Sequence, residues 1–267
     1  MKQHIVQSDE FTPKLSIITI NLNHRDGLQR TIENILSQTF NDFEWIIIDG
    51  GSTDGSRELI EQYTDYISYW VSEPDSGIYN AMNKGIHASH GEYLLFMNSG
   101  DTLYDNRIIE RVIPRLNGID IYVGDAMTEY GVSTLDLSSP SKILSTLLKR
   151  GFPHQSIFYR GNVFQSAGNY REDLKACSDW MLNIRAIVFN NATVEKIPFV
   201  VSVFEPGGIS TQKDIIADDI EKLVAENQNL SCIFGFYVKY FALIEKVRNN
   251  RLLRNFALWY AAKRKWV

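Results

Sequence analysis

The sequence has little of several features that would define other classes of protein. It has two cysteines, Cys177 and Cys232, which are too few for a disulfide framework or a zinc site and are typical of a reducing compartment. It has no uninterrupted apolar run of about 18 residues, the length that a membrane-spanning helix needs. Its N-terminal stretch MKQHIVQSDEFTPK lacks the apolar core of a signal peptide. We therefore expect a soluble, cytoplasmic protein.

An excess of positive charge is also absent. The formal net charge of -5 argues against a general nucleic-acid binder, so no nucleic-acid partner is expected. The charge is uneven: from Lys239 to the end, eight Lys and Arg residues face Glu245 alone, which gives this tail about +7 and the remainder about -12. The tail is also rich in Phe, Tyr and Trp. Such a tail suits either peripheral contact with a membrane surface or packing onto the domain or into a dimer interface, and both interpretations stay open.

What is present is the composition of an ordinary globular protein. The 267 residues, 44% apolar and 22% charged, suffice for one large domain or one domain with an appendage. Strands are predicted over residues 15–19, 43–48, 67–71 and 93–97, and helices over 26–38, 54–63 and 78–88. This alternation predicts an α/β fold with βαβ crossovers and a mostly parallel sheet flanked by helices.

The pattern is looser after residue 100. Helices are predicted over 107–116, 141–149 and 179–189, the last with Ser178 as its cap. Strands are predicted over 119–123 and 155–159, with a variable excursion over 127–137 and a β-rich stretch over 192–204. From Asp214 the chain turns helical. We expect one domain over residues 1–212 and a helical, basic and aromatic extension over 213–267.

Four polar segments each follow a predicted strand. They are Thr19–Asn23, Asp49–Gly55, Ser72–Gly77 and Asn98–Asp101. In sheets of this kind ligands bind beyond the carboxyl ends of the strands. The four segments therefore predict a single binding site at that edge of the sheet.

The segment IIIDGGSTDGS ends a strand on Asp49 and continues with Gly50 and Gly51. A carboxylate here can accept a hydrogen bond from a nucleobase, and Gly51 would let the backbone come close to a flat ligand. Asp54 suits the N-cap of the helix that follows. A plain strand–turn–helix connection would use the same residues, so both interpretations stay open.

Two further segments offer polar groups to the same edge. NSGD ends the strand 93–97, and its Asp101 can ligate Mg²⁺ or Mn²⁺, although a simple turn would use the same residue types. SEPDSGIYNAMNKG begins a helix whose Asn80 and Lys84 can reach a sugar or a phosphate, with a solvated helical face as the alternative. Gly85 inside that helix indicates tight packing or a close approach.

Later in the chain, KACSDWMLNIRA places Asp179 at the first turn of a helix. A carboxylate there can stabilise the helix through its macrodipole or act as a catalytic base. The segment FPHQSIFY contributes His154 and Gln155 at the mouth of a strand, where a hydrogen-bonded structural histidine is the alternative.

In this order and spacing, the segments resemble family-2 glycosyltransferases with the GT-A fold. The resemblance covers roughly residues 14–204 and rests on LSIITINLN, ILSQTFNDFEWIIIDGGSTDGS, SEPDSGIYNAMNKGIHASHGEYLLFMNSGD and PHQSIFYRGNVFQSAGNYREDLKACSDWMLNIRA. It implies an inverting enzyme of bacterial capsule, O-antigen or exopolysaccharide synthesis that requires Mn²⁺ or Mg²⁺. The donor would be a nucleotide-sugar, with UDP as the first choice of carrier. The acceptor would be a glycan or a lipid-linked oligosaccharide at the inner face of the cytoplasmic membrane.

The resemblance also implies roles for individual residues. Contacts to the nucleotide-sugar would come from Thr19, Asn21, Asn23, Asp49, Gly51, Asn80, Lys84 and Ser99. Asp101 would hold the metal, Asp179 would be the general base, and His154 and Gln155 would lie near the diphosphate or the acceptor. The nucleotide-sugar half would span about 14–125 and the acceptor half about 126–212.

The chain departs from the family pattern at two places. Asn98 and Gly100 stand where many members carry carboxylates, and Leu22 replaces an aromatic residue often found before Asn23. These departures favour a second hypothesis, a weakly active or inactive nucleotide-sugar-binding or scaffold protein of the same fold. A nucleotidyltransferase is a third class, but the chain has no Gly-rich stretch with the Arg and Lys typical of triphosphate handling.

Overall fold

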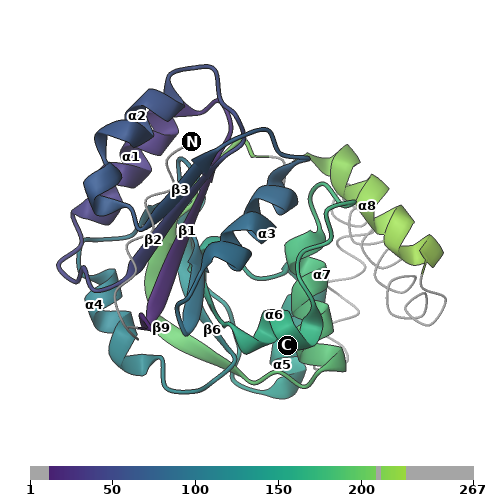
Figure 1. Cartoon of the computed structure of the whole chain (residues 1–267). Coiled ribbons are helices and arrows are strands. Elements are labelled where there is room, and N and C mark those ends of the chain that lie inside the picture. Colours follow the sequence, from purple (N-terminus) through teal and green to yellow (C-terminus); the bar gives the residue numbers. More distant parts are fainter. Residues whose placement is uncertain (1–11, 209–211, 227–267) are drawn as a thin grey trace. The chain divides into compact units, whose positions relative to one another are not determined.

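The computed structural model describes residues 12–208 and 212–226, and within them a nine-stranded sheet lies between helices (Figure 1). The strands are β1 (Leu15–Asn21), β2 (Glu44–Asp49), β3 (Tyr69–Ser72), β4 (Tyr93–Phe96), β5 (Thr102–Leu103), β6 (Ile121–Thr128), β7 (Gly131–Ser133), β8 (Ile157–Arg160) and β9 (Val194–Val203). The helices are α1 (Arg25–Leu36), α2 (Ser56–Gln62), α3 (Ile78–Ala88), α4 (Ile108–Val112), α5 (Pro140–Arg150), α6 (Asn162–Ala167), α7 (Ser178–Ile184) and α8 (Lys213–Glu226).

The first half of the sheet is parallel. Strands β3, β2, β1 and β4 lie side by side in that order, and all three pairings are parallel. Every residue of β1 is buried, as expected for a strand covered on both faces, and this explains its almost unbroken apolar sequence. The register places Asn21 opposite Asp49 and Asp49 opposite Ser72. The polar ends of three strands therefore meet at one edge of the sheet.

The second half of the sheet is mixed. Strand β8 is inserted antiparallel between β4 and β6, β9 pairs in parallel with β6, and β5 pairs antiparallel with β9. The stretch expected as a variable excursion contains β7, which folds back on β6 as a hairpin. The predicted α/β fold is thus confirmed, and its antiparallel pairs all involve strands that follow β4.

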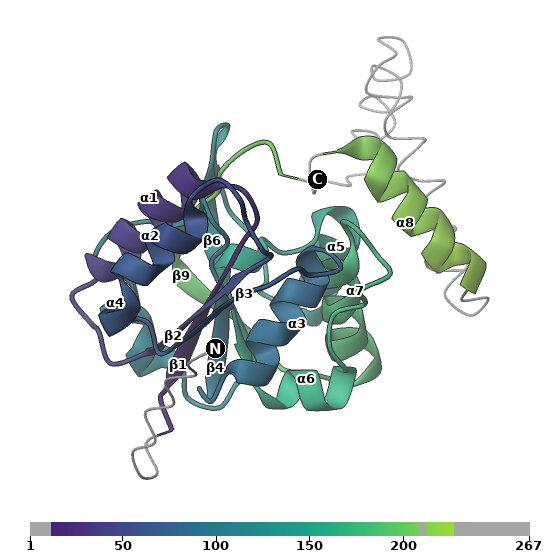
Figure 2. The ribbon, with the colours of Figure 1, turned by 45° about the horizontal axis from the view of Figure 1, so that its top comes forward.

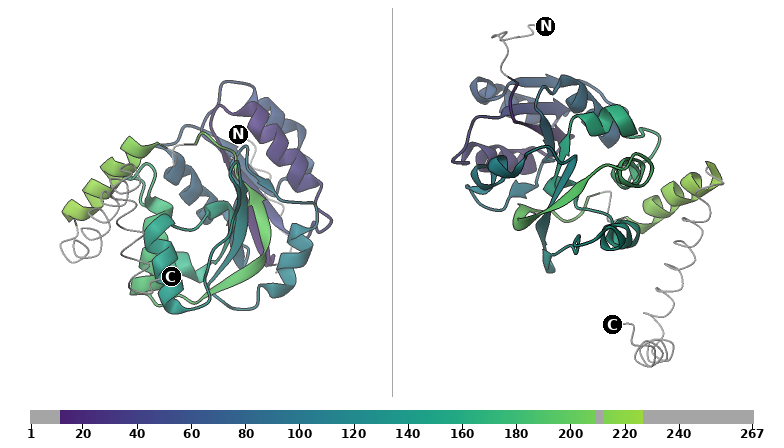
Figure 3. Two further views of the ribbon diagram at one scale, coloured as in Figure 1. Left: turned by 180° about the vertical axis from the view of Figure 1, so that it is seen from behind. Right: turned by 90° about the horizontal axis from the view of Figure 1, so that it is seen from below.

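Helices cover both faces of the sheet (Figures 2 and 3). Helices α1, α2 and α4 lie on one face, and α3, α5, α6 and α7 lie on the other (Figure 2). Leu28, Ile32 and Ile35 of α1 are buried in the core, which gives the predicted helical spacing its physical cause. The close approach expected at Gly85 is confirmed, because a Cβ added there would overlap Cγ2 of Ile18 on β1.

Several predicted boundaries change for local reasons. The helix expected to reach residue 116 ends at Val112 and continues as a 3₁₀ turn that contains Pro114, which lacks the N–H that an α-helix requires. Ser178 is not the cap of α7 but its first residue, and its Oγ accepts a hydrogen bond from the backbone N of Arg171. The last turn of the helix predicted over 179–189 is a π-helix, Arg185–Phe189.

By its internal contacts the chain divides into two units, residues 1–215 and 216–267. The helix predicted from Asp214 is present as α8. The basic and aromatic tail from Lys239, with its predicted membrane or dimer contact, lies outside the described residues. Among the residues that the structure describes, no helix is long and apolar enough to cross a membrane.

Candidate active site

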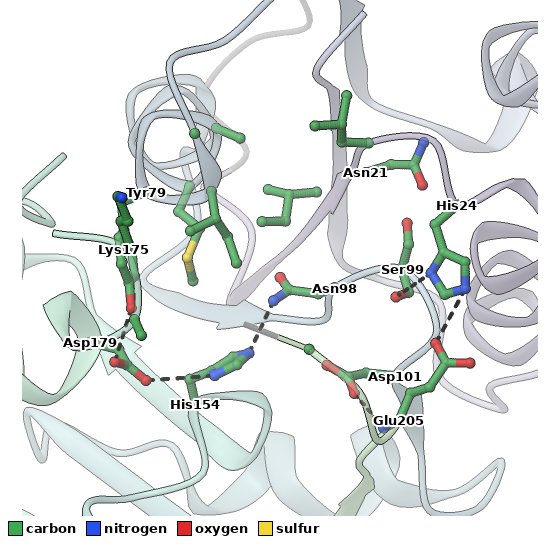
Figure 4. A pocket seen from close by; sticks show the side chains of 18 of the residues that line it. Asn21, His24, Tyr79, Asn98, Ser99, Asp101, His154, Lys175, Asp179 and Glu205 are labelled. Carbon is green, nitrogen blue, oxygen red and sulfur yellow. Dashed lines mark hydrogen bonds and ion pairs between the residues drawn. The ribbon is translucent and has the colours of Figure 1, made fainter. Parts of the chain in front are cut away.

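A cavity of about 600 Å³ opens beyond the carboxyl ends of β1 and β4 (Figure 4). Its wall combines the end of β1, the first turns of α3 and α7, the NSGD stretch and the segment Phe204–Gly208. Five residues singled out from the sequence line it: Asn21, Ser99, Asp101, His154 and Asp179. The expectation that polar strand ends form one site therefore agrees with the position of the cavity.

Asp49 lies behind this wall as a fully buried carboxylate. Its oxygens accept hydrogen bonds from Nδ2 of Asn21 (2.7 Å), from the backbone N of Ser52 (3.0 Å) and from the hydroxyls of Ser52 (2.5 Å) and Ser72 (2.6 Å). Burial raises the pKa of Asp49, but these hydrogen bonds outweigh it, so the pKa lies below its ordinary value. Asp49 thus ties together the ends of β1, β2 and β3.

The NSGD stretch is fixed by a side chain that the sequence did not single out. Oγ1 of Thr31, buried on α1, donates to the carbonyl oxygen of Asp101 (2.9 Å) and accepts from the backbone N of Gly100 (2.9 Å). In this conformation the side-chain oxygens Asn98 Oδ1 and Ser99 Oγ are buried, and neither has a hydrogen-bond partner among the described residues. Buried polar atoms of this kind indicate a ligand or water.

Asp101 is the most buried carboxylate of the cavity wall, with 5% of its surface exposed. Its Oδ1 accepts a hydrogen bond from the backbone N of Glu205 at 2.9 Å. Burial raises the pKa of Asp101 to about 6, with a further contribution from the negative charge of Glu205 and opposition from His154. A nearby cation would therefore favour the ionised form of this carboxyl.

Asp179 lies away from Asp101, with His154 and Asn98 between them (Figure 4). Its Oδ1 accepts from the backbone N of Trp180 (2.8 Å) and from the hydroxyl of Tyr79 (3.2 Å). Its Oδ2 lies 3.7 Å from Nδ1 of His154, beyond hydrogen-bond range. Burial, followed by the charge of Asp179, raises the pKa of Tyr79 well above its ordinary value, so Tyr79 stays protonated and acts as a donor.

His154 joins the two carboxylate regions. One ring nitrogen faces Asp179, and Nε2 lies 3.1 Å from Nδ2 of Asn98. Burial lowers the pKa of His154, but the carboxylate of Asp179 raises it by more, and Asp101 adds to the rise, so the pKa lies above its ordinary value. With Nε2 accepting from Asn98 Nδ2, the proton of the neutral ring lies on Nδ1 and faces Asp179, and a second proton on Nε2 would require the Asn98 amide to turn its oxygen toward the ring.

The remaining residues predicted for the site lie outside the cavity wall. The hydroxyl of Thr19 accepts from Nε1 of Trp45, Oδ1 of Asn23 accepts from the backbone N of Thr53, and the space above Gly51 is filled by backbone atoms of Glu73 and Pro74. Asn80 donates to Glu172, Lys84 pairs with Glu73 at 2.8 Å, and Gln155 is buried. Their contacts to a nucleotide-sugar stay predictions.

Sequence reasoning did not single out several titratable residues of the cavity wall, among them His24, Lys175 and Glu205. Glu205 opens the polar stretch EPGG one residue after the end of β9, so the rule that found the other four segments would have found this one. Nδ1 of His24 lies 3.3 Å from the carbonyl oxygen of Ser99, and no motif in the sequence points to that contact.

The residues present fit a divalent cation. Asp101, Glu205 and the unpartnered amide oxygens of Asn21 and Asn98 offer oxygen ligands, which Mg²⁺ and Mn²⁺ prefer. Within residues 12–208 and 212–226 no group of three or more His, Cys, Asp or Glu side chains is arranged to hold a metal. Such a cation would therefore rely on one or two carboxylates and on oxygens of a substrate.

An α/β sheet with a carboxylate-bearing cavity beyond its strand ends is the arrangement expected of a glycosyltransferase with the GT-A fold, although other α/β enzymes share it. Residues 16–171 match the family model of glycosyl transferase family 2. The PGL/p-HBAD biosynthesis glycosyltransferase of Mycobacterium tuberculosis is 32% identical over 206 residues, which cover 74% of this chain and 79% of the mycobacterial protein. The chain therefore belongs to glycosyl transferase family 2.

Solved structures agree with this fold. Residues 1–349 of TarS from S. aureus, in complex with UDP-GlcNAc, have a TM-score of 0.61 at 15% identity, over 79% of this chain and 66% of that TarS fragment. The mannosyltransferase PcManGT from Pyrobaculum calidifontis, in complex with GDP-Man and Mn²⁺, has a TM-score of 0.62 at 13% identity, over 100% of this chain and 84% of PcManGT. The chain spans just under two thirds of the TarS fragment 1–349 and 40% of the longer TarS chain.

Proposed function

We propose that this protein is an inverting, metal-dependent glycosyltransferase that moves a hexosyl or N-acetylhexosaminyl group from a nucleotide-sugar to a glycan or lipid-linked acceptor. The observation that carries the proposal is the pair of carboxylates in one cavity, Asp101 and Asp179, on separate elements with His154 and Asn98 between them (Figure 4). One carboxylate suits the departing diphosphate and the other suits the attacking hydroxyl. The proposed setting is bacterial surface polysaccharide synthesis.

The Asp101 end suits the donor. A Mn²⁺ or Mg²⁺ ion bound there would neutralise negative charge on the departing diphosphate. Ser99 Oγ and Asn21 Oδ1 are buried on the same wall without partners among the described residues, and they can bond the nucleotide-sugar. Solved relatives hold UDP-GlcNAc in one case and GDP-Man with Mn²⁺ in another, so a UDP-sugar is the first donor to test and a GDP-sugar the second.

The Asp179 end suits the acceptor. Two hydrogen bonds hold Oδ1, which leaves Oδ2 as the oxygen better able to take a proton from an acceptor hydroxyl. The deprotonated oxygen would attack the anomeric carbon from the side opposite the diphosphate. Attack from that side inverts the anomeric centre in one step, and no protein nucleophile is needed.

The first test is calorimetric titration of UDP, GDP and dTDP, each with Mn²⁺ and with EDTA, into the wild-type protein and into Asp101→Ala. We expect one nucleotide to bind tightly, and this binding to need both the metal and Asp101. Product analysis by NMR with the matching sugar nucleotide should then show inversion at the anomeric carbon. Retention of configuration would reject the one-step mechanism.

A nucleotide-sugar-binding protein without turnover is the second candidate. Asn98 and Gly100 in place of carboxylates, together with the lack of a three-ligand metal cluster among the described residues, favour it. This candidate requires nucleotide binding that ignores both EDTA and Asp101→Ala, and no transfer to any acceptor. The same titrations therefore decide between the two.

A lipid-linked acceptor would bring the protein to the inner face of the cytoplasmic membrane. The tail that would make this contact, or pair two copies, lies outside the described residues. Flotation with anionic liposomes tests the contact. Neutralising Lys263, Arg264 and Lys265 together should release the protein if charge holds it there, and unchanged flotation would reject an electrostatic role.

A further inference from the structure

The Glu205 carboxylate occupies the space that a side chain at position 100 would fill. Gly100 has a φ of +99°, and a Cβ added there would overlap Oε2 of Glu205. Position 100 is also one of the two at which the chain lacks a carboxylate that many family members carry. The segment after β9 therefore delivers a carboxylate to the place where the NSGD stretch has none.

Glu205 is held in this place from several sides. Its backbone N donates to Oδ1 of Asp101, which fixes the two residues side by side. One carboxylate oxygen, Oε1, pairs with Arg30 on α1. The other, Oε2, lies 3.5 Å from Nε2 of His24, too far for a well-formed hydrogen bond (Figure 4). Oε2 is also the atom that a Cβ at Gly100 would overlap.

The lining of the same cavity also includes a buried polar atom without a hydrogen-bond partner among the described residues. Asn21 is 4% exposed and lines the cavity, and its Oδ1 is buried without a hydrogen-bond partner among the described residues. Asn98 Oδ1 on the neighbouring strand end is in the same condition. Two carboxylates and two amide side chains line this one cavity, and oxygen ligands of these kinds suit a hard divalent cation and the groups bound to it.

We propose that Glu205 is the second carboxylate ligand of the divalent cation held by Asp101 and supplies the charge that Gly100 lacks. This inference rests on the proposed function, and it names a ligand that the NSGD stretch does not contain. Asp101 and Glu205 would each offer one oxygen, and the diphosphate and water would complete the coordination. Arg30 and His24 contact the Glu205 carboxylate but are not themselves ligands of the cation.

The test is Mn²⁺ binding, followed by the loss of the EPR signal of free Mn²⁺. It is made with whichever of UDP, GDP and dTDP the wild-type protein binds best. Glu205→Gln keeps the shape and removes the charge, and it should weaken Mn²⁺ binding by about tenfold or more, the scale of a lost metal-site partner. Glu195→Gln removes the same charge from an exposed position of β9 and is the matched control, with affinity unchanged.

Arg30→Gln distinguishes two roles for Glu205: a ligand of the cation, or a residue that only holds the segment after β9 in place through its ion pair. The substitution breaks the ion pair and keeps the carboxylate. Mn²⁺ affinity close to wild type in Arg30→Gln, with the loss confined to Glu205→Gln and Asp101→Asn, supports the inference. Equal losses of Mn²⁺ affinity in Arg30→Gln and Glu205→Gln would overturn the inference and show that Glu205 only holds its segment in place. Wild-type affinity in Glu205→Gln, with a loss in Asp101→Asn, would overturn it and leave the proposed function standing. No Mn²⁺ binding by the wild type with any of the three nucleotides would overturn both.

Discussion

Asn21 and Asp49 are register partners at the last positions of β1 and β2, and Nδ2 of Asn21 donates to Oδ1 of Asp49 at 2.7 Å. Asn21 lines the cavity, whereas Asp49 lies behind it and also accepts from Ser52 and Ser72. The buried carboxylate thus sets the position of a residue that lines the cavity. Asp49 should therefore affect the stability of the fold and the shape of the cavity wall.

The stability contributed by Asp49 should depend on pH. Its pKa in the folded protein lies below the ordinary value, so the ionised group stabilises the fold above the unfolded-state pKa, and this contribution is lost as the pH falls through the folded-state pKa. Asp49→Asn, which cannot titrate, should lower the free energy of unfolding by about 1–3 kcal/mol near neutral pH. Urea unfolding of both proteins from about pH 7 to pH 3 should show this difference shrinking. A difference that stays constant over the range would contradict the assignment.

Asp179→Asn should lower kcat by about 10²–10⁴-fold, the usual contribution of a general base, and leave nucleotide affinity unchanged. Tyr79→Phe removes only the hydrogen bond to Oδ1 and should cost about 0.5–1.5 kcal/mol of transition-state stabilisation, at most about a tenfold effect. Steady-state kinetics with the identified donor measure both variants. Near-normal turnover in Asp179→Asn would reject the base assignment.

Gly100→Ala should destabilise the fold by more than backbone strain alone explains. Gly118 is the matched control, because it also has a positive φ, +112°, but open space where its Cβ would be. Gly118→Ala should cost about 1–3 kcal/mol of strain, and Gly100→Ala should cost more because its methyl group displaces Glu205. Equal losses in thermal or urea unfolding would show that the Glu205 carboxylate moves aside without cost.

Gly85→Ala should also be destabilising, although alanine is the better helix former by about 1 kcal/mol. The added methyl group would overlap Cγ2 of Ile18, and such overpacking costs about 1–3 kcal/mol. A double-mutant cycle with Ile18→Ala isolates the effect, because removing Cγ2 should turn the alanine at position 85 from harmful to neutral or helpful. The same loss in both backgrounds would rule out this contact as the cause.

The parallel half of the fold could be predicted because its signals are local. Apolar runs, helical spacing and polar turns each lie within about ten residues, and α3 has the same bounds, Ile78–Ala88, as the helix expected. The insertion of β8 between β4 and β6 is a different matter. It depends on pairings between strands far apart in the chain, which the sequence pattern of any one strand does not record.

The candidate site shows the same limit. Asp101 and Asp179 could be located because each stands at the end or the start of an element, where polar residues are conspicuous. Glu205 could be found only as one more polar residue after a strand. Its contact with Gly100 could not be predicted from the sequence, because that contact depends on tertiary packing. The burial of Asp49 behind the cavity is likewise a product of register between strands rather than of residue type.

The pairing of β4 has a consequence for how binding and folding are coupled. Because β8 runs antiparallel to β4, the turn His154–Ser156 that precedes β8 lies beside the NSGD stretch that follows β4, and β9 returns Glu205 to the same place. A ligand that contacts these segments binds only when the parallel and the mixed halves are folded together. Its binding free energy then adds to the free energy of unfolding of the whole sheet. A saturating nucleotide should therefore raise the melting temperature of both halves in a single transition.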